Sequence, residues 1–134
     1  MKAIADTGFV VAFRNRTDRY HAWALDLANS ITDPLLTCES VLSEAAFHLG
    51  STEAVLALVD DGLLRVAFDC SRHLDALREL AERYRDRSPD FADICLIRMS
   101  EIHPNYPVIT IDAADFRVYR RNKREVIPTI CPPN

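Results

Sequence analysis

Short apolar runs alternate along this chain with longer segments whose apolar residues recur at helical spacing. The runs cover residues 2–5, 35–38, 63–68 and 108–111, and a last short run lies near 126–127. Strands of a parallel sheet are covered by helices on both faces, so they are apolar throughout. The alternation therefore predicts an α/β fold, a three-layer α/β/α sandwich around a mostly parallel central sheet.

Length and composition narrow the classes of protein that fit this pattern. The 134 residues are enough for one domain with a full core, and we expect a single domain over residues 1–134. Apolar residues make up 49% and charged residues 27%, which excludes a disordered or collagen-like chain. The net charge of -4 means that a polyanion would have to meet a local basic patch rather than the whole surface.

The N-terminal residues show no targeting pattern, and no apolar run approaches the roughly 20 residues of a membrane-spanning helix. The four cysteines, at positions 38, 70, 95 and 131, form no Cys-x-x-Cys pair. We therefore expect reduced thiols and a cytoplasmic protein.

Four carboxylates stand beside apolar runs. Asp6 and Asp112 follow the first and fourth runs, while Glu44 and Asp93 lie in helical segments. Ser88-Pro89 fits the N-cap and first position of the helix that carries Asp93. Taken singly, each acid has an ordinary explanation: a cap, a favourable place near a helix N-terminus, a turn, or exposure to solvent.

Together the four acids predict a metal site. The carboxyl ends of parallel strands meet at one edge of the sheet, where ligands bind, and the two helices can lean over that edge. A set of oxygen ligands without His or Cys suits Mg²⁺ or Mn²⁺. Such an ion can activate a water molecule and stabilise the charge that develops on a phosphodiester.

Four stretches, in this order, resemble the motifs of PIN-domain ribonucleases and, within them, the VapC-type toxins of type II toxin–antitoxin systems. The first is Ala-Asp-Thr-Gly at 5–8 with the apolar residues after it, and the second is Val-Leu-Ser-Glu-Ala at 41–45. The third begins with Phe-Ala-Asp-Ile-Cys at 91–95, and the fourth covers 108–121. The resemblance extends over almost the whole chain.

The resemblance implies a metal-dependent endoribonuclease, with a cognate antitoxin as partner. It implies that Mg²⁺ or Mn²⁺ is held by the four acids and that a water molecule hydrolyses the RNA. The catalytic and metal-binding residues would be Asp6, Glu44, Asp93 and Asp112.

The fourth stretch departs from the family pattern by one residue. Ala113-Ala114 separates Asp112 from Asp115, where the family has a single residue, so either aspartate can be the one that points inward. Asp112 is favoured because it follows the buried run directly, which leaves Asp115 to cap the turn or support the ligands. Thr7 and Thr110 are expected to orient ligands by hydrogen bonds.

A basic segment follows the fourth acid, with five cations in eight positions. It fits an ordinary solvated loop, an RNA-backbone groove with an aromatic residue for base stacking, or a surface for an acidic antitoxin segment. The apolar surface of residues 18–60 fits a homodimer or an antitoxin helix. The candidate RNA-binding residues are Arg117, Tyr119, Arg120, Arg121, Lys123 and Arg124.

Other functions remain alternatives. Asp-Thr-Gly at 6–8 also occurs in aspartic proteases, but these are all-β and this chain has three glycines and long helical segments. A phospho-acceptor receiver domain needs a lysine near its fifth strand, and Lys2 and Lys123 are badly placed for that role. A PIN-fold module that binds RNA or protein without cleaving, and a PIN nuclease with no antitoxin, also stay open.

Overall fold

Five short parallel strands form the central sheet of the structure, a computed structural model that describes residues 1–133. The order across the sheet is β3-β2-β1-β4-β7, with the first strand in the centre. This confirms the predicted α/β fold. The strands are β1 (Ile4–Ala5), β2 (Leu35–Thr37), β3 (Leu64–Val66), β4 (Val108–Ile109) and β7 (Thr129–Ile130).

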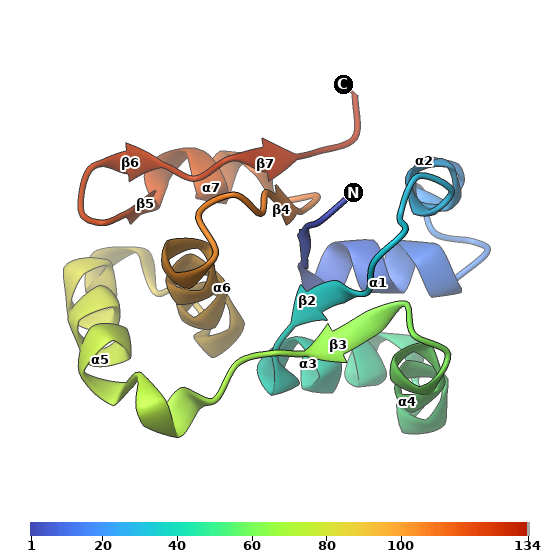
Figure 1. The fold of residues 1–134 in the computed structure, drawn as a ribbon, viewed down its shortest axis with the longest axis horizontal. Helices are drawn as coiled ribbons and strands as arrows, with labels where there is room; N and C mark the ends of the chain where they lie inside the picture. The colour runs from blue at the N-terminus through green and yellow to red at the C-terminus, as the bar shows by residue number, and fades with distance from the viewer. Residues whose placement is uncertain (134) are drawn as a thin grey trace.

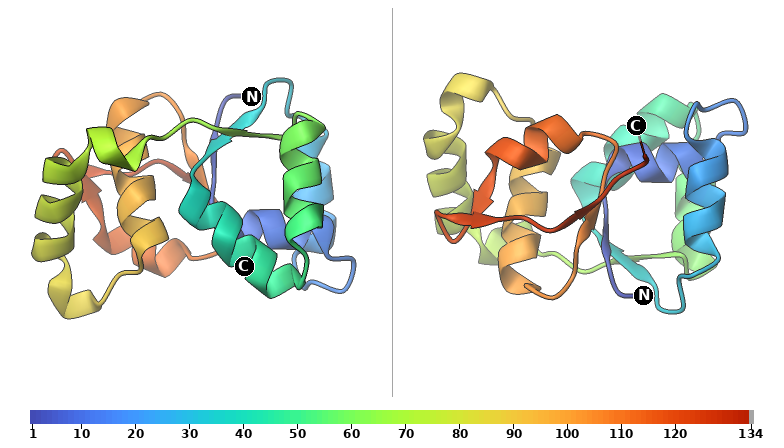
Figure 2. Two further views of the ribbon diagram at one scale, coloured as in Figure 1. Left: turned by 90° about the horizontal axis from the view of Figure 1, so that it is seen from below. Right: turned by 90° about the horizontal axis from the view of Figure 1, so that it is seen from above.

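Helices cover both faces of this sheet, which gives the predicted three layers. Helices α5 and α6 lie on one side and α1, α2 and α4 on the other (Figures 1 and 2). Helix α3 packs against α1 and α4 and also contacts α6. The helices are α1 (Thr7–Arg14), α2 (His21–Ala28), α3 (Glu39–Leu49), α4 (Thr52–Asp60), α5 (Leu74–Arg83), α6 (Phe91–Ile102) and α7 (Ala113–Val118), with 3₁₀ turns at Cys70–Arg72 and Arg85–Arg87.

The last strand predicted from the sequence, near residues 126–127, forms outside the central sheet. Residues Glu125–Val126 form β6, which pairs antiparallel with β5 (Arg120–Arg121) in a separate hairpin. Asn122 and Lys123 take positive φ angles of 48° and 70°, the left-handed backbone that a tight hairpin turn requires. The chain then returns to the sheet, and the fifth strand is β7, which pairs parallel with β4.

The four cysteines are free thiols, and Cys38 and Cys95 are buried in the core. Within residues 1–133, no helix is both long enough and apolar enough to cross a membrane.

Gly8, in the first turn of α1, allows that helix to approach the chain that leaves β4. A Cβ atom built on Gly8 would lie 2.7 Å from Cδ1 of Ile111, well inside van der Waals contact. Ile111 stands between Thr110 and Asp112, so this close approach brings the start of α1 and the end of β4 together. Asp6 immediately precedes α1 and also hydrogen-bonds to β4 through its backbone.

We predict that Gly8→Ala destabilises the protein, although alanine is the better helix former by about 1 kcal/mol. The clash with Ile111 should lower the free energy of unfolding by about 1–3 kcal/mol, as overpacked cores do. Urea denaturation measures the change. When both proteins also carry Ile111→Ala, Gly8→Ala should lower the free energy of unfolding by less, because the side chain that it meets is shorter. A Gly8→Ala variant more stable than wild type would contradict this account.

Candidate active site

A pocket of about 740 Å³ lies where β1 and β4 end, and six carboxylates line it. None of the described residues that line this pocket is a lysine or an arginine, and His48 is the other ionisable side chain on its wall. The pocket therefore concentrates negative charge with no opposite charge on its lining. All four acids predicted from the sequence are among the six, which are Asp6, Asp18, Glu44, Asp90, Asp93 and Asp112.

Asp6 is the most deeply placed of these acids, with 4% of its surface exposed. It caps α1, and its Oδ1 accepts a hydrogen bond from the backbone N–H of Thr7 at 2.7 Å. Its Oδ2 accepts one from the hydroxyl of Thr110, also at 2.7 Å. Burial nevertheless raises the pKa of Asp6 to about 6, because these two hydrogen bonds offset only part of the lost hydration.

Two threonine hydroxyls join the acids to one another across different elements. Thr7 Oγ1 donates to Oε1 of Glu44 at 2.6 Å, which ties α3 to the start of α1. Thr110 Oγ1 donates to Asp6 and accepts from the backbone N–H of Asp112 at 2.9 Å. Both threonines thus make the kind of contact expected from the sequence.

Asp93 faces the pocket from the first turn of α6. Burial, together with the neighbouring charges of Asp90 and Asp6, raises the pKa of Asp93 to about 7. The hydroxyl of Tyr119 donates to Oδ2 of Asp93 at 3.2 Å. Burial and the Asp93 carboxylate raise the pKa of Tyr119, which keeps this hydroxyl protonated and able to donate.

The structure places Tyr119 in the interior, which corrects its expected role in base stacking. Its side chain is 3% exposed and packs edge-on against the rings of Phe116 and Tyr84. No face of the ring is open to a nucleotide. Tyr119 instead donates a hydrogen bond to Asp93 from the protein interior.

Asp112 and Asp115 lie in different hollows. Asp112 lines the pocket of Asp6, while Asp115 lines an adjoining hollow of about 480 Å³ together with Asp93 and Tyr119. Partial burial, with the charges of Asp115 and Asp90, raises the pKa of Asp112. Of the two alternatives, Asp112 is the aspartate that lines the pocket of Asp6.

Asp18 and Asp90 line the pocket, but sequence reasoning did not single them out. Asp90 is the N-cap of α6, and its Oδ1 accepts from the N–H of Asp93 at 2.8 Å. The predicted start at Ser88-Pro89 is wrong, because Ser88 has the left-handed φ of 47° that ends the preceding turn. An aspartate directly before Phe91 was a usable capping signal. Asp18 lies in a loop, and nothing around it in the sequence marked it.

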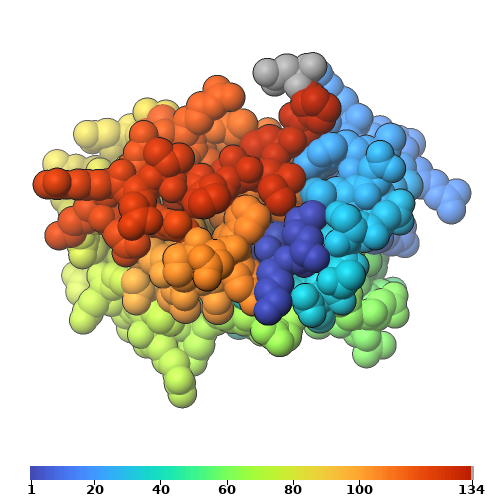
Figure 3. Space-filling model, turned by 45° about the horizontal axis from the view of Figure 1, so that its top comes forward, coloured from blue at the N-terminus to red at the C-terminus, as the bar shows by residue number. Residues whose placement is uncertain are grey.

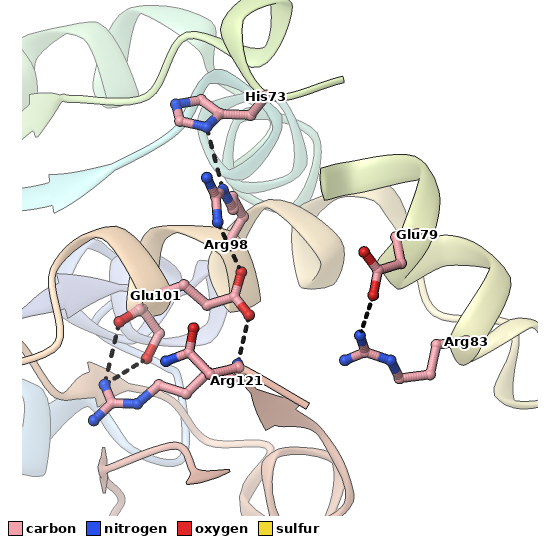
Figure 4. A network of polar contacts seen from close by, with 8 residues as sticks. His73, Glu79, Arg83, Arg98, Glu101 and Arg121 are labelled. Atoms are coloured by element: carbon pink, nitrogen blue, oxygen red, sulfur yellow. Dashed lines mark hydrogen bonds and ion pairs between the residues drawn. The ribbon is translucent and has the colours of Figure 1, made fainter. Parts of the chain in front are cut away.

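The basic segment is divided between buried and exposed residues, and none of it lines the acidic pocket. Arg121 is 8% exposed and donates to the carbonyl oxygens of Ser100 and Pro104 on or just after α6, at 3.2 and 3.0 Å. Its Nε pairs with Glu125 at 3.0 Å. These contacts anchor the hairpin on α6, and Figure 4 shows the bonds from the Arg121 guanidinium to that helix. A structural role thus replaces the expected contact of Arg121 with RNA.

The other basic residues are more accessible. The guanidinium of Arg120 donates to the carbonyls of Arg117 and Tyr119, so it is partly engaged within the chain. Arg117, Lys123 and Arg124 have exposed side chains. Their contact with RNA stays a prediction.

The donor set of the pocket fits a hard divalent cation. In residues 1–133 no three His, Cys, Asp or Glu side chains are already arranged to hold a metal ion. The pocket nevertheless offers carboxylate oxygens with no lysine or arginine on its lining, and burial raises the pKa of Asp6 and of Asp93 by more than their hydrogen bonds lower it. Mg²⁺ keeps several of its waters and needs only one or two direct carboxylates.

Comparison with known proteins identifies the family. The PIN domain family matches residues 3–122, and the chain therefore belongs to it. The structure is similar to that of VapC20 from Mycobacterium tuberculosis, described as a Sarcin-Ricin loop cleaving toxin, with a TM-score of 0.65 and 21% sequence identity. The match covers 76% of this chain and 83% of that one, and at this identity it establishes a shared fold. A comparison with curated proteins gives no match.

The raised pKa of Asp93 predicts how the metal-free protein responds to pH. The folded-state pKa of about 7 exceeds the unfolded value of 3.8, so the folded state binds the proton more tightly. The contribution of Asp93 to the free energy of unfolding is therefore largest below pH 4 and is lost as the pH rises toward 7. Asp93→Asn should remove this loss. Because Asp93 is only partly buried and solvent screens its charge, the free energy of unfolding at pH 7.5 should rise by about 1–2 kcal/mol, less than the full pKa shift would give.

Thermal unfolding in EDTA at pH 5 and pH 7.5 measures this effect. The advantage of Asp93→Asn over wild type should be larger at pH 7.5 than at pH 5. An advantage independent of pH, or a variant less stable than wild type at pH 7.5, would contradict the prediction.

Proposed function

We propose that this chain is a metal-dependent endoribonuclease that acts in the cytoplasm as a single PIN domain over residues 1–134, and that it is the toxin of a toxin–antitoxin pair. The observation that carries the proposal is the pocket of six carboxylates at the strand ends of a PIN fold, with no lysine or arginine on its lining. Such a negatively charged pocket attracts a divalent cation and repels a phosphate group that arrives without one.

In this proposal Asp6, Glu44, Asp93 and Asp112 hold Mg²⁺ or Mn²⁺. The ion, when bound, supplies activation of water and stabilisation of the charge that develops on the phosphodiester. Their hydrogen-bond partners fix the orientation of the acids: Thr110 on Asp6, Thr7 on Glu44 and Tyr119 on Asp93. Asp115 supports the site from the adjoining hollow.

The proposed partners are an RNA substrate, an antitoxin and a second copy of the chain. A groove of about 470 Å³ between α3 and α4 adjoins the acidic pocket, because Ser43 and Phe47 line both. Phe47 is 81% exposed and Leu56, on the same groove, is 55% exposed. This apolar surface supports a protein partner, either the antitoxin or the second copy.

RNA cleavage tests the proposed activity. The substrates are a mixed RNA pool and a Sarcin-Ricin loop hairpin, the second chosen because of the likeness to VapC20. Wild type should cut at least one of them with Mg²⁺ or Mn²⁺ and neither in EDTA. Asp6→Asn and Asp93→Asn should each cut at least about 100-fold more slowly, a loss typical of central catalytic groups.

Asp26→Asn is the matched control, since Asp26 is an exposed acid on α2 outside the pocket, and it should cut like wild type. Equal cutting by wild type and by both pocket variants would show that the site is wrong. A folded wild type that binds RNA but cuts neither substrate would favour the alternative of a binding module.

The toxin assignment has its own test. A gene for a small DNA-binding protein directly upstream, whose product co-purifies with this chain and stops cleavage, would support it. Cleavage without any such inhibitor would leave a PIN nuclease with no antitoxin.

A further inference from the structure

An acidic pocket poses a problem for a nuclease, because RNA is a polyanion. Six carboxylates line the pocket and the whole chain carries a net charge of -4, so the strand needs cations at the rim. The basic segment near the C-terminus does not line the pocket, and Arg121 within it is buried. The following inference rests on the proposed function and asks where the RNA backbone is held.

The loop between α1 and α2 reaches the rim of the pocket. Asp18, in this loop, is one of the lining residues, although it lies four positions beyond the end of α1. Arg16 and Arg19 lie on either side of Asp18 with exposed side chains beside the pocket lining rather than in it, and Arg14 ends α1 just before them. The loop stands at the outer edge of the molecule in Figure 1, and the blue segment projects from the right-hand edge in Figure 3.

The backbone of this loop is fixed by its own side chains. Asn15 Oδ1 accepts hydrogen bonds from the N–H and the hydroxyl of Thr17, at 3.1 and 2.9 Å. Asp18 Oδ1 accepts from the N–H of Tyr20 at 2.8 Å, and the ring of His21 contacts the carbonyl of Ala12 at 2.7 Å. The arginines thus project from a preorganised turn, and less backbone freedom is lost when a ligand binds.

The three guanidinium groups are not used to hold the protein together. Within residues 1–133, none of Arg14, Arg16 and Arg19 forms an ion pair or a side-chain hydrogen bond. Arg19 lies over the ring of Tyr20, 5.1 Å from its centre, a contact that leaves its N–H groups free. Other arginines of the chain do pair with acids, namely Arg72, Arg83, Arg85, Arg98 and Arg121.

We infer that Arg14, Arg16 and Arg19 form the phosphate-binding rim of the active site. They neutralise backbone phosphates of the RNA on the side of the pocket where Asp18 lies. The RNA chain then passes over the carboxylates of the pocket. Phosphate contacts of this kind position a strand without reading its sequence.

The test compares two variants that remove the same charge from different surfaces. Arg16→Gln with Arg19→Gln changes the loop, and Arg65→Gln with Arg78→Gln is the control, because these two arginines are exposed on β3 and α5 and lie outside the pocket. The probe is a fluorescein-labelled 20-nucleotide RNA of random sequence, and its binding is measured by anisotropy in EDTA between 50 and 200 mM salt. Omitting the metal prevents cleavage and separates binding from catalysis.

The loop variant should bind about tenfold more weakly than wild type. The slope of log K against log salt should fall by about 1.4, since each phosphate contact on a single strand contributes about 0.7. The control variant, Arg65→Gln with Arg78→Gln, should stay within about twofold of wild type. The inference is overturned if the loop variant binds like wild type, if the control variant loses as much, or if wild type binds no RNA.

Steady-state cleavage distinguishes failure of this inference from failure of the proposed function. The loop variant should raise KM and leave kcat near the wild-type value, because it changes no residue of the pocket. If wild type cleaves RNA and the loop variant has an unchanged KM, the rim lies elsewhere and the nuclease stands. If wild type binds RNA through the loop but does not cleave it, the inference stands and the nuclease does not.

Discussion

The rest of the site depends on the hydrogen bonds that the buried Asp6 carboxylate accepts. It is buried where the central strand β1 meets β4, and its two oxygens accept hydrogen bonds from α1 and from Thr110 after β4. Thr7 then extends the connection to Glu44 on α3. This arrangement requires the close approach of α1 to Ile111, which only the absence of a side chain at Gly8 allows. The packing of the core therefore determines the positions of the acids.

The site is also a source of instability in the metal-free protein. Burial raises the pKa of Asp6 to about 6 and that of Asp93 to about 7, so both charges are unfavourable near neutral pH. Clustered charges of one sign in a pocket are typical of sites whose ligand carries the opposite charge. The core stabilises the fold enough to tolerate them, and a bound cation would return part of the lost stability.

Much of this organisation could be predicted from the sequence, because it depends on local patterns. The apolar runs predicted the parallel strands, and the acids that follow two of these runs predicted the edge of the sheet where the pocket lies. Glu44 and Asp93 were predicted to join the same site because their helices can lean over that edge, and the resemblance to PIN domains supported all four acids. The pairing of the last strand could not be predicted, since Glu125–Val126 looks like a strand whether its partner is β4 or the hairpin.

The roles of other residues depend on tertiary packing, which a single sequence does not reveal. A run of cations is usually solvated, yet Arg121 is buried by its contacts with Ser100, Pro104 and Glu125. Tyr119 is enclosed by the ring of Phe116, in the helix that it ends, and by the ring of Tyr84. Asp18 reaches the pocket from the loop between α1 and α2, which no sequence pattern placed there. Asp90 did carry a capping signal, but the sequence analysis favoured Ser88-Pro89 as the start of that helix.

Four of the six pocket carboxylates, Asp6, Glu44, Asp93 and Asp112, are proposed to hold a divalent cation, and direct binding of Mn²⁺ tests this most closely. Calorimetric titration of the metal-free protein at pH 7.5 should show saturable binding by wild type and by Asp26→Asn. The double variant Asp6→Asn with Asp93→Asn should remain folded, by circular dichroism, and lose this binding. Absence of binding to folded wild type, or equal binding by the double variant, would contradict the account.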